Sequence, residues 1–236
     1  MQGTGDSNRA NRNGGAGSHR TELDHGWRYE ARFSSLAASG AYLHGEADLV
    51  ESFKPSLVLD AGCGTGRVAI ELDRRGIPVV GVDVDLGMLE VARSKAPQLV
   101  FIEHDLSAPT LRDAINERCG PQLFDVIVAA GNVMIFTEEG TEPEVLSNMA
   151  SLLAPHGHFI AGFQVSQDIK PKRRDLRSVR PGPAQPGLAA GPHRLSLEDY
   201  DYMAEAAGLV LKSRFATWER DPYHSGDYAV SVHCLA

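Results

Sequence analysis

Two carboxylates and three glycines in the first half of the chain have the residue types and spacing needed to bind a nucleoside. Asp60 follows an apolar run, and Gly62, Gly64 and Gly66 come next in the order D-A-G-C-G-T-G. Asp83 ends a second apolar run about 20 residues later, the offset at which an acid accepts hydrogen bonds from a ribose diol. A carboxylate at Asp60 suits a ligand with an ammonium group or another positive centre and would repel a pyrophosphate.

A strand, a glycine turn and a helix must position these residues. The apolar residues 57–59 predict a buried strand of a parallel sheet, and Val68, Ala69 and Leu72 share one face of a predicted helix. Glycines let the backbone approach a ligand closely, and the amides at the start of the helix point into the same crevice. This unit predicts a doubly wound sheet, in which ligands bind beyond the carboxyl ends of the strands.

Periodicity predicts further elements along the chain. The expected strands are residues 57–59, 78–82, 99–103, 123–129, 158–163, 209–215 and 227–233. Helices are expected after an N-cap at Asp85, over residues 142–153 and after an N-cap at Ser196, with a turn at residues 155–157.

The sequence VLDAGCGTGR at residues 58–67 resembles the first motif of the class I S-adenosylmethionine-dependent methyltransferases. A dinucleotide fingerprint would instead carry a third glycine at the G-x-G-x-x-G position. The resemblance, over about residues 40–236, implies an α/β, Rossmann-like doubly wound sheet of order 3-2-1-4-5-7-6 with strand 7 antiparallel. It also implies S-adenosylmethionine as cofactor and S-adenosylhomocysteine as product.

The same resemblance implies further cofactor contacts. The segment D-V-D-L-G-M-L is similar to the family's D-x-S-x-x-M-L, and Asp105 stands where the family has an acid that accepts from the adenine amino group. As alternatives, Asp105 caps the next turn and Met88 is a core residue. Besides the two carboxylates and three glycines above, the expected contacts are Val84, Met88, Asp105, Leu106 and Ala130.

Two polar side chains are candidates for the chemistry. Asn132 follows the fourth expected strand, where its amide could orient a nucleophile or only close a turn. His44 lies in a segment that the resemblance places over the crevice, and it is a candidate general base. The resemblance implies in-line displacement that depends mainly on positioning, onto an oxygen, nitrogen or carbon nucleophile of a small molecule.

The candidates for the substrate pocket come from both ends of the chain. The resemblance places lid helices over residues 25–54, and Tyr29 and Arg32 belong to this segment. We expect Arg214, Trp218 and Tyr228 to cluster at the C-terminal rim. As an alternative, the two aromatic residues simply pack against the edge of the sheet.

Composition suggests one domain with flanking and inserted segments. Residues 1–24 have almost no large apolar side chains and are expected to form a disordered leader, followed by a single domain at 25–236. Residues 168–194 are rich in proline and arginine, which predicts a long loop. This loop is either a solvated mobile segment or a basic lid for an anionic substrate.

Charge and cysteine content exclude other classes of protein. The net charge of −8 disfavours general nucleic-acid binding. Three widely spaced cysteines imply no disulfide framework, and no metal site is expected. The chain lacks a long apolar run and an apolar signal segment, so we expect a cytoplasmic protein with no membrane partner. We also expect a monomer or homodimer.

Two other functions stay open at this stage. A methyltransferase acting on protein or nucleic acid is favoured only by the basic loop. A Rossmann-like protein that binds a nucleotide without methyl transfer would also account for the glycine turn.

Overall fold

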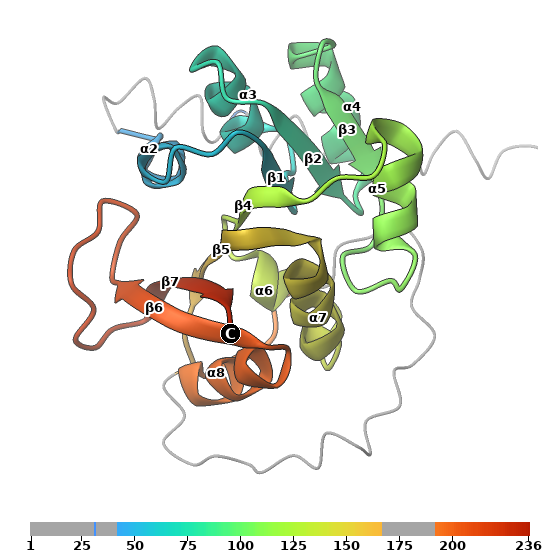
Figure 1. Cartoon of the computed structure of the whole chain (residues 1–236). Helices are drawn as coiled ribbons and strands as arrows, with labels where there is room; N and C mark the ends of the chain where they lie inside the picture. The colour runs from blue at the N-terminus through green and yellow to red at the C-terminus, as the bar shows by residue number, and fades with distance from the viewer. Residues whose placement is uncertain (1–30, 32–41, 167–191) are drawn as a thin grey trace, which may run out of the picture.

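One sheet of seven strands organises the part of the chain that the computed structural model describes, which is residue 31, residues 42–166 and residues 192–236. The strands are β1 (Val58–Ala61), β2 (Val79–Asp83), β3 (Val100–Glu103), β4 (Phe124–Ala129), β5 (Leu153–Gln164), β6 (Leu209–Phe215) and β7 (Tyr228–Leu235). Their order is β3-β2-β1-β4-β5-β7-β6, and β7 runs antiparallel to both of its neighbours (Figure 1). The strand order expected from the resemblance is confirmed.

Helices cover both faces of this sheet. They are α2 (Gly45–Ser52), α3 (Arg67–Arg74), α4 (Leu86–Lys95), α5 (Leu111–Cys119), α6 (Val133–Phe136), α7 (Glu142–Leu152) and α8 (Leu197–Ala206). The predicted sites Tyr29 and Arg32, the leader and nearly all of the basic loop lie outside the described residues. The domain boundaries therefore stay predictions.

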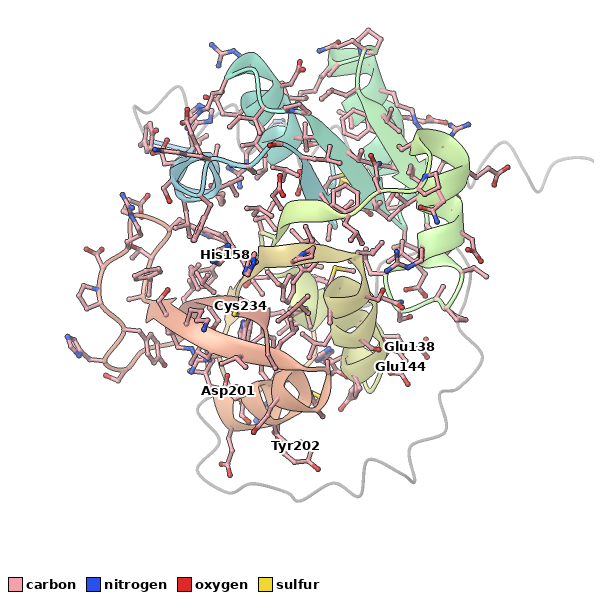
Figure 2. The ribbon with its side chains drawn as sticks, viewed as in Figure 1. Glu138, Glu144, His158, Asp201, Tyr202 and Cys234 are labelled. Carbon is pink, nitrogen blue, oxygen red and sulfur yellow. The ribbon has the colours of Figure 1, made fainter. Side chains whose placement is uncertain are left out.

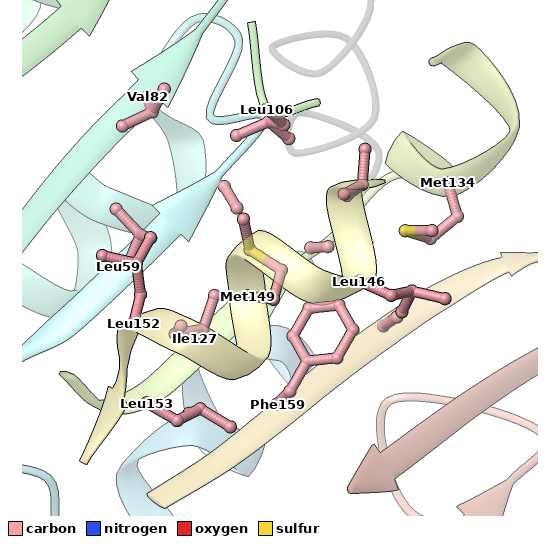
Figure 3. Close-up of a cluster of buried hydrophobic side chains, with 14 of the residues drawn as sticks. Leu59, Val82, Leu106, Ile127, Met134, Leu146, Met149, Leu152, Leu153 and Phe159 are labelled. Atoms are coloured by element: carbon pink, nitrogen blue, oxygen red, sulfur yellow. The ribbon is translucent and has the colours of Figure 1, made fainter. Parts of the chain in front are cut away.

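Alternation along the strands divides the core in two. In β1, Leu59 belongs to the core layer that contains residues of α5, α6, α7 and α8, whereas Val58 belongs to the layer that contains residues of α2, α3 and α4. Figure 3 shows the first of these layers, where Leu146 and Met149 of α7 approach Phe159 of β5. Both faces are apolar because parallel strands are buried on both sides.

The start of β5 corrects the expected turn at residues 155–157. The strand begins at Leu153 and includes these residues, with a register shift against β4. His156 adopts a left-handed φ of 68°, and a Cβ on Gly157 would lie 2.9 Å from the carbonyl oxygens of Ala154 and Phe124. The turn residues therefore form an irregularity inside the strand instead of preceding it.

Two predicted helix caps are confirmed, and two helices are additional. The side chain of Asp85 accepts from the Met88 amide at 3.0 Å, and that of Ser196 accepts from the Asp199 amide at 3.0 Å. The sequence analysis predicted neither α5 nor α6. The short helix α6 begins directly after Asn132 and becomes important at the site.

Ion pairs attach α2 to α3. Arg75, just after α3, lies 2.8 Å from carboxylate oxygens of both Asp48 and Glu51 on α2 and 2.9 Å from Glu71 on α3. Its side chain is only 17% exposed, so these contacts are partly shielded from solvent. They hold α2 beside the helix that follows the glycine turn.

Within the described ranges, no helix has both the length and the apolar character needed to cross a bilayer. The same residues contain no group of three or more His, Cys, Asp or Glu side chains placed to bind a metal ion. Cys63, Cys119 and Cys234 are free thiols.

We expect Leu146→Ala to destabilise the protein by about 2–5 kcal/mol, because it leaves a cavity between α7 and the sheet. Urea unfolding would measure the change. The control is Glu144→Ala, an exposed position on the same helix (Figure 2), which should alter stability by less than about 0.5 kcal/mol. Equal effects of the two substitutions would contradict the assigned packing.

Candidate functional site

The turn between β1 and α3 wraps around the end of β2. The amides of Gly62 and Cys63 both donate to the carbonyl of Val82, at 2.8 and 3.0 Å. Gly62 has a φ of +75°, and a Cβ there would lie 2.4 Å from a methyl group of Val133. A Cβ on Gly64 would meet nothing within 4 Å. The turn is thus closed by Val133 at one end and open at Gly64.

Asp83 lies at this open part of the turn. Its Oδ2 accepts from the Gly64 amide at 2.7 Å, and its Oδ1 accepts from the Asp85 amide at 2.9 Å. Burial raises the pKa of Asp83, while these amides act to lower it. A carboxylate has about four acceptor directions, so capacity remains for hydroxyl groups of a ligand. The arrangement fits a ribose diol.

Asp60 has a structural partner in the first turn of α3. It is 1% exposed, and its Oδ2 accepts from the Ala69 amide at 3.0 Å. Since the N-cap residue Gly66 has no side chain, β1 supplies the cap for α3. Burial raises the pKa of Asp60 to about 7, against the lowering effect of the Ala69 bond. Its contact with a positive cofactor group stays a prediction.

Asp105 follows β3, and its side chain accepts hydrogen bonds within the same loop. The Oδ1 atom accepts from both the amide and the hydroxyl of Ser107, each at 2.8 Å. Asp105 thus forms the turn cap that was the alternative interpretation, and its role toward adenine stays a prediction. The neighbouring Leu106 is buried in the core, and its carbonyl accepts from Asn148 at 2.8 Å.

Three apolar candidates lie near the carboxyl ends of the strands. Val84 directly follows β2, and Met88 lies in the first turn of α4; both are partly exposed. Ala130 follows β4 and is 8% exposed. These positions border the crevice in which a doubly wound sheet binds its ligand.

Asn132 ties the ends of β4 and β5 together. Its backbone has a left-handed φ of 73°, and its amide donates to the Gly162 carbonyl at 3.1 Å. Its Oδ1 accepts from the Gln164 amide at 2.7 Å. Asn132 therefore closes the turn, as one of its two interpretations required. Its action on a nucleophile stays a prediction.

Trp218 and Tyr228 meet over the end of β5. The indole nitrogen of Trp218 donates to the Tyr228 hydroxyl at 3.0 Å. A Cβ on Gly162 would lie 2.3 Å from the indole ring and 2.8 Å from that hydroxyl. On α2, a Cβ on Gly45 would lie 3.0 Å from the Trp218 Cβ. The two aromatic residues thus form a wall between β5 and α2.

Arg214 does not join this wall, and its role in a substrate pocket stays a prediction. Its Nε donates to the Ser231 hydroxyl at 2.9 Å, and its guanidinium pairs with Asp201 of α8, labelled in Figure 2. Tyr228 packs with the core layer on the opposite face of the sheet. Arg214 is paired with Ser231, which is three residues from Tyr228 along β7, so Arg214 and Tyr228 lie on different faces.

A partly buried ion pair that the sequence analysis did not single out connects α2 to the glycine turn. Arg67 begins α3 and makes a two-pronged contact with Glu46, one branch of which is 3.0 Å long. Arg67 also donates to the Leu43 carbonyl. The signal available in the sequence was the position of Arg67 directly after the motif glycines.

His44 contacts α3. Its Nδ1 lies 3.7 Å from Glu71, and its ring packs edge-on against Tyr42 at a centroid distance of 5.7 Å. The described structure does not show a contact that would identify His44 as a base. That role stays a prediction.

The chain matches the family described as "Methyltransferase domain" over residues 58–157. It is 38% identical over 85 residues to a magnesium-protoporphyrin O-methyltransferase of Rhodobacter capsulatus, covering 34% of this chain and 33% of that protein. It is 32% identical over 106 residues to a ubiquinone biosynthesis O-methyltransferase of Vibrio cholerae, covering 43% of this chain and 39% of that protein. The chain thus spans well under half the length of these curated relatives.

The fold has close counterparts among solved structures. A TehB-like SAM-dependent methyltransferase from Corynebacterium glutamicum superimposes with a TM-score of 0.70 and 28% identity, covering 90% of this chain and 99% of that chain. The likeness therefore extends over almost the whole of the compared structure and includes the strands that carry the site.

We expect Asp60→Asn to remove part of the pH dependence of stability. Since burial raises the pKa of Asp60 from 3.8 to about 7, the folded state retains a proton that the unfolded state releases between these values. The contribution of Asp60 to the free energy of unfolding of the wild-type protein therefore falls as the pH rises toward about 7. Urea unfolding would measure the free energy of unfolding of both proteins at about pH 5 and about pH 8. The value for the variant minus that for wild type should be higher at pH 8 than at pH 5 by at least ~1 kcal/mol. A difference that is the same at both pH values would contradict this assignment.

Proposed function

Because this chain belongs to the class I S-adenosylmethionine-dependent methyltransferases, we propose that it transfers a methyl group to a hydroxyl oxygen of a small molecule. The observation that carries the proposal is the carboxylate of Asp83 beside the open turn at Gly64, joined by a 2.7 Å hydrogen bond. This pair offers acceptors for a ribose diol and room for close approach of the nucleoside.

The residues of the crevice have separate tasks in this proposal. Asp83 holds the ribose, Asp105 and Leu106 meet the adenine edge, and the glycine turn lies along the amino-acid end of the cofactor. S-adenosylmethionine supplies a methyl group already activated on a sulfonium. Asn132 orients the acceptor, and the Trp218–Tyr228 wall excludes water. Alignment of this kind can lower a barrier by roughly 7–11 kcal/mol.

A hydroxyl acceptor is favoured over the nitrogen and carbon nucleophiles that were also expected. Both curated relatives named above are O-methyltransferases, which supports the choice while leaving the substrate open. The net charge of −8 disfavours a nucleic-acid substrate. Cytoplasmic location and a monomeric or homodimeric state stay predictions.

We expect S-adenosylmethionine and S-adenosylhomocysteine to bind with micromolar affinity, about −8 kcal/mol, in isothermal titration calorimetry. Asp83→Asn should weaken both by roughly 10–150-fold, because hydrogen bonds to a charged carboxylate are lost. Asp113→Asn is the control: it makes the same charge change at an exposed position of α5 and should leave affinity unchanged.

Two outcomes of the calorimetry would contradict the proposed cofactor site. One is binding of NAD in place of both S-adenosyl compounds, which would favour the nucleotide-binding alternative. The other is equal affinity of the Asp83→Asn and Asp113→Asn variants, which would remove Asp83 from the site.

We expect isotopically labelled methyl groups to enter hydroxylated small molecules when the protein and labelled S-adenosylmethionine are incubated with a metabolite extract. Parallel incubations would contain total protein or total RNA instead. Mass spectrometry of the labelled products would identify the methylated atom. Label found only in protein or RNA would overturn the small-molecule assignment.

A further inference from the structure

A cavity of about 430 Å³ lies at the carboxyl end of β5. Ile135 of α6, Gln164 and Ser166 at the end of β5, and His193 and Leu195 before α8 line it. Its volume falls in the range of about 300–1,000 Å³ that is usual for small-molecule sites. The lining mixes apolar side chains with a few polar groups, which is also usual for such sites.

The short helix α6 connects this cavity to the glycine turn. Its first residue, Val133, packs against Gly62, while Ile135, two residues on and on a different side of the helix, lines the cavity. The Gln164 amide, at the cavity, donates to the side chain of Asn132 at 2.7 Å. The cavity therefore adjoins Asn132, which follows β4 at the carboxyl end of the sheet.

A buried histidine and a buried glutamate meet at the cavity. The His193 Nε2 lies 3.1 Å from the Glu142 Oε1, and both side chains are 7% exposed. Glu142 is fixed through its other oxygen, which accepts from the Gly140 amide at 2.8 Å. The His193 amide donates to the Ile135 carbonyl at 2.9 Å, so the backbone that carries the imidazole is also held.

The imidazole of His193 has unused hydrogen-bonding capacity. Within the described part of the chain, neither ring nitrogen completes a hydrogen bond, and the contact with Glu142 is one of charge and distance. Buried polar atoms are rarely left in this state unless a ligand or water satisfies them. The nitrogen that does not face Glu142, Nδ1, is thus enclosed and without a partner among the described residues, and a ligand that reaches it would satisfy it.

Charged groups flank His193 on the segments packed around it. Glu142 of α7 faces it directly, and Glu139 lies close to Glu142. The cavity lining contributes the neutral side chains of Gln164, at the end of β5, and Ser166, just after it, and the exposed cation Arg194 from the position next to His193. Burial raises the pKa of Glu142, and a positive charge on His193 opposes that rise.

We propose that this cavity binds the hydroxyl-bearing acceptor and that His193 is the general base, with Glu142 as its positioning residue. The inference rests on the proposed function and specifies its acceptor site. The acceptor oxygen bonds to the methyl carbon while the methyl–sulfur bond breaks and its electron pair stays on sulfur. The hydroxyl proton passes to His193 and later to solvent. One positive charge is lost at sulfur, and one appears beside Glu142.

The test measures the pKa of His193 by NMR in the full chain, saturated with either S-adenosylmethionine or S-adenosylhomocysteine. Only the former carries a sulfonium charge, and a nearby positive charge disfavours the imidazolium. We expect the His193 pKa to be lower with S-adenosylmethionine by about half a unit or more. His156, at the opposite end of β5, is the internal control and should not change. No acceptor is needed.

Glu142→Gln tests the positioning role. Loss of the carboxylate should lower the His193 pKa by about one unit or more, whereas Glu144→Gln, at an exposed position on the same helix, should not. An unchanged His193 pKa in Glu142→Gln would overturn that role. Should this variant fail to fold, the comparison of the two ligands in the wild-type chain still decides the main proposal.

Different experimental results would contradict this inference and the proposed function. If both ligands bind in calorimetry and the His193 pKa is the same with each, the cavity is not the acceptor site and the methyltransferase proposal survives. If neither ligand binds, the proposed function fails, and the assignment of His193 fails with it.

Discussion

The site depends on the hydrogen bond from the Gly64 amide to Asp83. This bond joins the turn after β1 to the end of β2, so that a carboxylate and an open stretch of backbone face the same space. Contact between Val133 and Gly62 fixes the other end of the turn. Because α6 starts at Val133, the same turn also sets the position of the cavity beside β5.

Three carboxylates that are buried or partly buried illustrate how the fold tolerates desolvated charge. Burial raises the pKa of Asp60, Asp83 and Glu142. Each accepts a hydrogen bond from a backbone amide, so desolvation is partly offset. Their tasks differ: Asp60 caps a helix, Asp83 faces the crevice, and Glu142 faces His193.

Local patterns were sufficient for much of the fold. The bounds of β6 and the caps at Asp85 and Ser196 follow from periodicity and short-range hydrogen bonding, and the structure has them as predicted. The irregular start of β5 could not be predicted, because it depends on the carbonyl of Phe124 in a neighbouring strand. The face occupied by Arg214 likewise depends on its register with β7.

The candidate site shows the same division. The glycine turn follows β1, and Asp83 ends β2, the next strand along the chain. Their spacing in the sequence was therefore sufficient to predict that they lie together. Glu142 and His193 come from α7 and from the segment before α8, and no local pattern links them. Their pairing, like that of Glu46 with Arg67, is visible only after the elements have packed.

The most direct measurement of the central claim is a crystal structure of the protein with S-adenosylhomocysteine. The account predicts both ribose hydroxyls within about 2.5–3.0 Å of the Asp83 carboxylate, with the nucleoside lying along the open side of the turn at Gly64. A nucleoside bound elsewhere, or a ribose that does not contact Asp83, would contradict it.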